Sequence, residues 1–181
     1  MAGEATRALL GARVEVRRVG PADREEFVRL ALQSTAFHHP WIQAPLSGSD
    51  FARYVARFDG AYAIGFVLRD REAGELVGFV NLNEIVMGPY RRGLLGYGLF
   101  EPAAGRGYMV DGLAVVMRYA FDVLKLHRLE ADIQPANYRS RLLVTRLGFR
   151  CEGLSPGFIC IDDTWVDHER WAITAQMRRS G

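Results

Sequence analysis

The stretch EPAAGRGYMVDGLAVVMRYAFDVL, residues 101–124, joins a glycine-containing turn to an apolar helical pattern. From Val110 onward its apolar side chains recur at the spacing of one helical face. The preceding segment GLLGYGLF, residues 93–100, alternates small and large apolar residues as a half-buried strand does. The turn between them contains Gly105, Arg106 and Gly107. This order predicts a strand, a glycine-hinged loop and a helix in succession.

A loop with two glycines that opens onto a helix can bind a phosphate. Its backbone N–H groups point outward beside the positive end of the helix dipole. Val110 stands where a Rossmann fingerprint needs its third glycine, and the Gly-Lys-Ser/Thr of a Walker A loop is absent. At this point two interpretations stay open: a phosphate-binding loop of another kind, or an ordinary turn.

The composition is that of one ordinary globular domain. With 181 residues, 49% of them hydrophobic and 24% charged, the chain can bury a real core. We expect a single domain over residues 1–181, with 1–12 as a flexible tail and a core over about 14–174. A net charge of +2 with mixed signs gives no footprint for nucleic acid. No signal-like segment or membrane-length apolar run is visible, so we expect a cytoplasmic protein that does not bind membranes.

Strands and helices alternate along the rest of the chain. Strands are expected at about residues 14–18, 61–69, 76–83, 93–100, 127–133, 149–161 and 165–174. Helices are expected after Asp23, over 50–57, from Met109 to Leu124 and over 137–147. Two prolines and several turn formers predict a long loop over residues 34–50. The sum is a mixed α/β domain with about four helices and six or seven strands.

Three segments together resemble a known family. They are GYGLFEPAAGRGYM, HRLEADIQPANYRSRLLVTRLGFRCEG and IDDTWVDHERWAI, in this order along the chain. They resemble the GNAT superfamily of acyl-CoA-dependent N-acetyltransferases, and within it the RimJ/RimL type, which modifies the amino termini of ribosomal proteins. The resemblance covers about residues 14–174 and is closer to RimJ. It implies a mixed, mostly antiparallel central sheet, splayed between its fourth and fifth strands and flanked by helices.

The resemblance implies acetyl-CoA as the acyl donor. The scattered histidines form no zinc pattern, so no metal is expected. Backbone N–H groups of the glycine loop would hold the pyrophosphate of acetyl-CoA, and the pantetheine arm would bond to the fourth strand. Asn137 would bond to a pantetheine amide or would only cap a helix. Arg139 would approach the CoA phosphate or would only be solvated. The positions that match the family's cofactor-binding motifs are Leu99, Gly105, Arg106, Gly107, Tyr108, Asn137, Arg139 and Ser140.

The family implies direct attack of the amine on the thioester, without an acyl-enzyme, so Cys151 and Cys160 need not be nucleophiles. Ser140 matches the position proposed as the acid toward the leaving thiolate; alternatively it is a hydroxyl in the first turn of a helix. A glutamate that some relatives carry before the last hairpin has no counterpart in residues 157–160. Glu84 is a candidate general base, and a solvated carboxylate is its alternative.

The acceptor is expected between the loop at residues 37–41 and the last hairpin. Trp41 and Trp165 would grip it and Asp167 would attract its ammonium group, with His168 beside it; alternatively these side chains belong to the core or fix the hairpin. The expected acceptor is the α-amine of a ribosomal or other protein. A small amine, such as a polyamine, amino acid or antibiotic, and a non-catalytic acyl-CoA-binding module are the alternatives. A monomer and a homodimer both stay open.

Overall fold

A computed structural model describes residues 8–179, which form one eight-stranded sheet. The strands stand in the order β1-β2-β3-β4-β5-β6-β8-β7, and each neighbouring pair is antiparallel except β5 and β6, which are parallel. This confirms the expected mixed, mostly antiparallel sheet. The bounds are β1 Leu9–Leu10, β2 Val14–Arg18, β3 Ile64–Asp70, β4 Leu76–Val86, β5 Arg92–Leu99, β6 Arg128–Ile133, β7 Arg150–Ile161 and β8 Thr164–Thr174.

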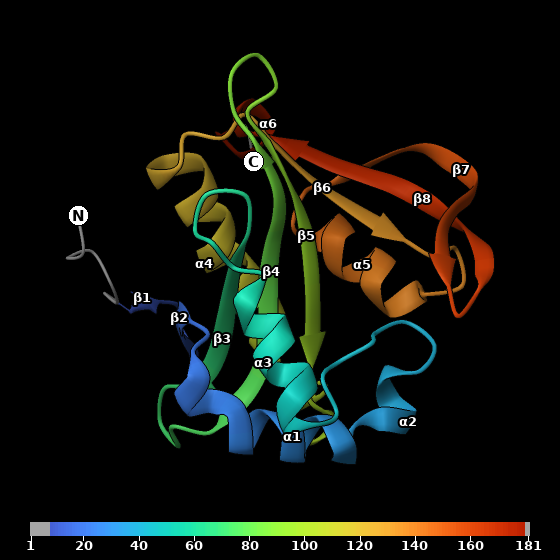
Figure 1. Cartoon of the computed structure of the whole chain (residues 1–181). Helices are drawn as coiled ribbons and strands as arrows, with labels where there is room; N and C mark the ends of the chain where they lie inside the picture. The colour runs from blue at the N-terminus through green and yellow to red at the C-terminus, as the bar shows by residue number, and fades with distance from the viewer. Residues whose placement is uncertain (1–7, 180–181) are drawn as a thin grey trace.

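Helices cover both faces of this sheet. Figure 1 shows α1 and α3 in front of the strands and α4 behind them. Among the described residues, no helix is long and apolar enough to cross a membrane. The bounds are α1 Arg24–Gln33, α2 Thr35–His38, α3 Gly48–Ala56, α4 Tyr108–Arg118, α5 Tyr138–Arg146 and α6 Ala175–Arg179, with short 3-10 turns at Pro21–Asp23 and Glu101–Ala103 and a π-helical turn at Tyr119–Val123.

The two faces of the sheet bury two hydrophobic clusters. Side chains alternate across a strand, so Phe66 and Leu68 of β3 pack into the cluster under α4, whereas Val67 packs into the cluster under α1 and α3. Phe27 of α1 is fully buried in the second cluster, and its ring lies 5.2 Å from that of Phe100, next to β5. The aromatic cluster therefore fixes α1 against the end of β5.

The segment expected to be a loop over residues 34–50 contains regular structure, and this part of the prediction was wrong. Ser34 donates its hydroxyl to the Leu30 carbonyl and accepts the N–H of Glu101, at 2.7 and 2.9 Å. This tertiary contact ends α1 and starts α2. Ser47 then accepts the N–H of Asp50 at 3.1 Å and caps α3, which begins at Gly48. The contact of Ser34 with Glu101 could not be inferred from local pattern, because the two residues are 67 positions apart, whereas the Ser47 cap is local.

The structure also differs from the expected elements at the N-terminus and in the numbers of helices and strands. Leu9–Leu10, in the stretch expected to be a tail, form β1; residues 1–7 lie outside the described range. The Asp111 carboxylate of α4 accepts the N–H groups of Ala12, Arg13 and Val14, which ties this segment to the domain. Within residues 8–179 there are six α-helices rather than about four, because α2 and α6 add to the four expected, and eight strands rather than six or seven.

Candidate functional site

The parallel strands β5 and β6 pair over only three positions and then separate. Arg92 lies opposite Arg128 and Leu94 opposite Glu130, and no pairing follows. Beyond this point a cleft of about 1630 Å³ opens between residues 95–99 of β5 and 131–133 of β6. The expected splay between these strands is confirmed. The cleft also reaches the glycine loop, the first turns of α5 and the segment after α2.

One edge of β5 faces this cleft with its backbone groups unpaired to any strand. The Phe100 N–H donates to the Val77 carbonyl of the β4 segment at 3.0 Å. Because bonded positions alternate in an antiparallel ladder, the backbone groups of Leu95, Tyr97 and Leu99 point away from β4 and toward the cleft. The Leu99 carbonyl accepts Nε2–H of His38 at 2.7 Å, while its N–H lies on the same edge. The structure thus brings Leu99 to the cleft.

The glycine loop lies at one end of the cleft. Gly105 and Gly107 have φ values of +75° and +81°, where side chains other than hydrogen are disfavoured, and Gly107 precedes the first residue of α4. Both glycines line the cleft. The side chains of Arg106 and Tyr108 do not line the cleft. The Arg106 guanidinium stacks 5.1 Å from the Tyr108 ring, and the Tyr108 hydroxyl donates to Asp70. Arg106 and Tyr108 can therefore offer this cleft only their backbone groups.

The start of α5 forms the opposite wall. Asn137 accepts the N–H of Ser140 at 3.1 Å and so caps the helix. The Ser140 hydroxyl lies 2.6 Å from the hydroxyl of Tyr97, which sequence reasoning did not select. Burial raises the pKa of Tyr97 to about 12, so its hydroxyl keeps its proton at neutral pH. The Arg139 guanidinium lies 5.7 Å from the Phe37 ring, a contact that connects α5 to α2 across the cleft.

The expected acceptor residues are only partly brought together. Trp41 and His168 line the cleft, and His168 is 4% exposed. Trp165 is 66% exposed and is not part of the lining. Asp167 is exposed as well, and its carboxylate accepts the Gly157 N–H at 2.7 Å, which fixes an irregular stretch of β7. Asp167 therefore has a structural role in the hairpin.

Glu84 lies away from the cleft. It occupies an irregular stretch of β4 between Asn83 and Val86, with a φ of +48°. Its carboxylate accepts from Arg92 at 3.3 Å, and Arg92 also pairs with Glu130 at 3.0 Å. This ion-pair network sits where β5 and β6 are still joined, and Glu84 is not among the lining residues.

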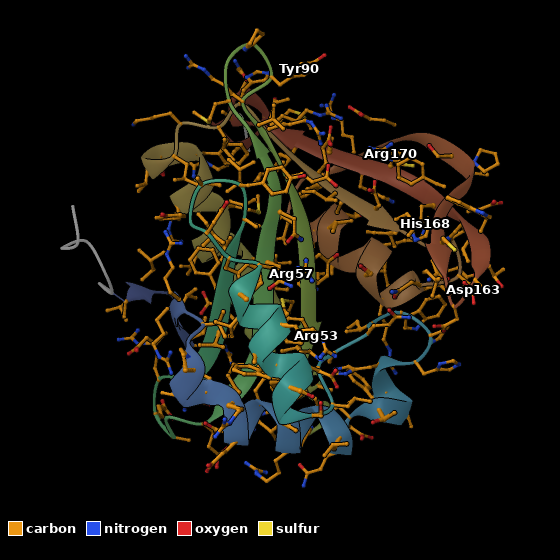
Figure 2. The ribbon with its side chains drawn as sticks, viewed as in Figure 1. Arg53, Arg57, Tyr90, Asp163, His168 and Arg170 are labelled. Carbon is orange, nitrogen blue, oxygen red and sulfur yellow. The ribbon has the colours of Figure 1, made fainter. Side chains whose placement is uncertain are left out.

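Asp132 is a further residue that the sequence did not single out. Its side chain is 8% exposed, lines the cleft and pairs with Arg170 of β8 at 2.6 Å. Burial raises the pKa of Asp132, against the lowering effect of Arg170. Figure 2 labels Arg170 and His168, both on β8. The only sequence signal for Asp132 was its place in the alternating pattern of β6, which does not tell a cleft-lining residue from a solvated one.

Comparisons with known proteins agree with this geometry. Residues 13–150 match the family model described as Acetyltransferase (GNAT) domain. The chain is 35% identical over 112 residues to [Ribosomal protein uS5]-alanine N-acetyltransferase of Escherichia coli, covering 62% of this chain and 58% of that protein. It is 37% identical over 98 residues to a probable N-acetyltransferase of Bacillus subtilis, covering 54% of each. The chain thus spans little more than half the length of these relatives.

A solved structure extends the comparison to the whole fold. The chain superposes on Mycobacterium smegmatis RimJ in complex with CoA-disulfide with a TM-score of 0.86 and 25% identity, over 94% of this chain and 88% of that one. The overall fold of the chain is therefore shared with that protein. Since the family model matches most of its length, the chain belongs to the GNAT acetyltransferase family.

Proposed function

We propose that this protein transfers the acetyl group of acetyl-CoA to a primary amine, and that its acceptor is the N-terminal α-amine of a protein. The observation that carries the proposal is the free edge of β5, which faces the start of α5 across a cleft that ends at the glycine loop. An extended, amide-containing arm that ends in a pyrophosphate matches this combination of strand edge and helix N-terminus.

The donor would bind mainly through backbone groups. The pantetheine amides would pair with the cleft-facing N–H and carbonyl groups of Leu95 and Tyr97 and with the Leu99 N–H, as an added strand pairs with a sheet edge. The pyrophosphate would accept N–H groups from residues 105–108, beside the positive end of the α4 dipole. The cleft volume of about 1630 Å³ leaves room for this arm and for part of an acceptor. Arg139, near the start of α5, is the proposed contact for a CoA phosphate.

The acetyl group would move by direct attack. The amine nitrogen bonds to the thioester carbonyl carbon, and the carbon–sulfur bond breaks as the oxyanion collapses. A backbone N–H on the free edge of β5 would stabilise that oxyanion. Ser140 would donate its hydroxyl proton to the leaving sulfur and take one from Tyr97, which is protonated at neutral pH and would regain its proton from solvent after the products leave. The amine nitrogen gives up the balancing proton to a base.

The acceptor would reach the cleft between the segment after α2 and the β7–β8 hairpin. Figure 1 shows the chain between α2 and α3 extending toward that hairpin, and Gln43 donates to Asp162 of the hairpin turn at 3.0 Å. Trp41, Ile159 and Ile161 give this end an apolar lining. The E. coli relative is named as an alanine N-acetyltransferase of ribosomal protein uS5, which supports a protein, and a ribosomal protein in particular, as acceptor.

Initial rates of CoA release with matched acceptors test this proposal. The acceptors are a short peptide with a free N-terminal alanine, the same peptide with a blocked N-terminus and an internal lysine, and spermidine. We expect turnover with the first peptide alone. Turnover with spermidine alone would replace the proposal with a small-molecule acetyltransferase. CoA binding without turnover of any acceptor would identify a non-catalytic module.

A further inference from the structure

The cleft contains a buried histidine that the donor-binding machinery does not use. His168 of β8 is 4% exposed, yet its side chain lines the cleft. Its Nδ1–H donates to the Val166 carbonyl at 2.9 Å. Among residues 8–179, its Nε2 has no hydrogen-bond partner. In the neutral ring the other nitrogen then carries a lone pair, because a neutral imidazole has one donor and one acceptor.

The surroundings of His168 hold the ring in place. Asp132 of β6 lies directly opposite Arg170 of β8, so their side chains share a face of the sheet. His168 is two residues before Arg170 on β8, so its side chain lies on the same face. The Arg170 guanidinium pairs with Asp132 at 2.6 Å and stacks 4.4 Å from the Phe158 ring. The same Phe158 ring lies 6.4 Å from the His168 ring in an edge-on arrangement. The imidazole is thus confined by β6, β7 and its own strand.

The charged groups around the ring leave it as the available proton acceptor. Asp132 is neutralised by Arg170, which also lies 3.9 Å from Glu130. Glu169 projects to the opposite face, where it pairs with Arg141 of α5 at 2.9 Å. Asp167 is occupied by the Gly157 N–H, and Glu84 by Arg92. Asp132 also lines the cleft, but its carboxylate is held in the ion pair with Arg170, whereas Nε2 of His168 is paired with no charged or hydrogen-bonding group among residues 8–179.

We infer that His168 is the general base of the acetyl transfer. This inference rests on the proposed function. As the amine nitrogen bonds to the thioester carbon, Nε2 of His168 accepts one proton from that nitrogen and becomes part of an imidazolium. The proton later passes to solvent, while the leaving sulfur receives its own proton through Ser140. The Nδ1–H bond to Val166 persists in both charge states, because Nδ1 is a donor in each.

Two substitutions separate this role from a structural one. His168→Asn keeps a side-chain N–H near the position of Nδ1, so it can still donate to Val166, but it has no basic atom at the position of Nε2. His168→Gln places a non-basic amide near Nε2. We expect both variants to lower kcat on the order of 10²-fold, the ordinary contribution of a general base. We also expect the acidic limb of the pH–rate profile to disappear, with the Kd of acetyl-CoA unchanged.

Cys160→Ser is the matched control, because this exposed residue lies on the same hairpin. Its rate and pH profile should equal those of the wild type. If either folded His168 variant keeps the wild-type kcat and acidic limb, the inference is overturned. A loss of kcat that comes with a loss of acetyl-CoA binding would also overturn it, in favour of a structural role. Absence of turnover in the wild type would instead refute the proposed function, and this role with it.

Discussion

The hydroxyl of Tyr97 on β5 lies 2.6 Å from the hydroxyl of Ser140 on α5. This contact joins the two walls of the cleft at the level where β5 and β6 have separated. Each residue alone has a plain structural explanation, as a strand aromatic and as a hydroxyl in the first turn of a helix. Together they form a short chain of two hydroxyls, and Tyr97 is protonated at neutral pH, so the chain can deliver a proton to a leaving thiolate.

Removing either hydroxyl should slow the transfer step. We expect Ser140→Ala to lower kcat on the order of 10²-fold and Tyr97→Phe to lower it by less, because water can replace the outer donor. The double variant should be little worse than Ser140→Ala, since the two act in series. Steady-state kinetics measure this. The control is Tyr54→Phe, which removes an equally buried hydroxyl bonded to Asn81 at 2.6 Å but away from the cleft. Additive losses in the double variant would contradict a relay.

The glycine loop should respond to a single methyl group. Gly107→Ala forces a side chain into a left-handed conformation at φ +81°, at a cost of about 1–2 kcal/mol. No atom lies within 4 Å of the added carbon, so the effect acts through the backbone and the N–H groups it positions. We expect weaker acetyl-CoA binding and lower stability, by calorimetry and thermal unfolding. Gly20→Ala, at φ −147° and also in open space, should change neither; an unchanged Kd in Gly107→Ala would contradict a phosphate role.

Direct attack predicts that no acetyl-enzyme forms. Both cysteines are free and exposed on β7, and neither lines the cleft. After the protein is mixed with acetyl-CoA in the absence of acceptor, we expect intact-protein mass spectrometry to show only the unmodified mass. A variant with both cysteines replaced by serine should keep the wild-type kcat. A stoichiometric acetyl adduct that an acceptor discharges would show that the transfer is covalent.

The buried His38 should make the domain sensitive to mild acid. Burial lowers the pKa of His38, partly offset by its bond to the Leu99 carbonyl and by Glu101, so the folded state binds this proton less readily than the unfolded state. Its contribution to stability is therefore full above the unfolded pKa of about 6.5 and is lost as the pH falls below it.

Denaturant unfolding at several pH values tests this effect. His38→Gln keeps an N–H for Leu99 but cannot titrate, so the decline in unfolding free energy between about pH 7 and 5 should flatten in this variant. Asp23 and Asp111 also have lowered pKa values, because hydrogen bonds to their carboxylates outweigh the effect of burial. The stability that these carboxylates contribute is lost at lower pH than that of His38. An identical slope in the wild type and His38→Gln would remove His38 as the cause.

Much of the donor half of the site was predictable from sequence because it is local. The alternation in β5, the two glycines before α4 and the Asn137 cap of α5 are each set by neighbouring residues. Their convergence on one cleft was implied by the resemblance to the GNAT superfamily. The contacts of His38 with Leu99 and of Tyr97 with Ser140 join residues 61 and 43 positions apart, so no local pattern could indicate them.

The acceptor half of the site was harder to predict from sequence, because the directions of its side chains depend on contacts that are not local. Glu84 was selected as a residue at the end of a strand, but the direction of its side chain depends on the irregular pairing of β4 with β5 and on Arg92. Trp165 and Asp167 lie on the hairpin beside the cleft, yet strand alternation and the stretch around Gly157 turn them outward. His168, one residue further on, reaches the cleft. A shift of one position along a strand exchanges one face for the other.

A crystal structure of the protein with bound CoA would show whether the donor lies in the cleft between β5 and β6. The free edge of β5 and the glycine loop predict pantetheine amides paired with the backbone of residues 95–99 and a pyrophosphate within hydrogen-bond distance of the N–H groups of residues 105–108. Pantetheine bound outside the β5–β6 cleft, or a pyrophosphate that makes no contact with the glycine loop, would contradict the account.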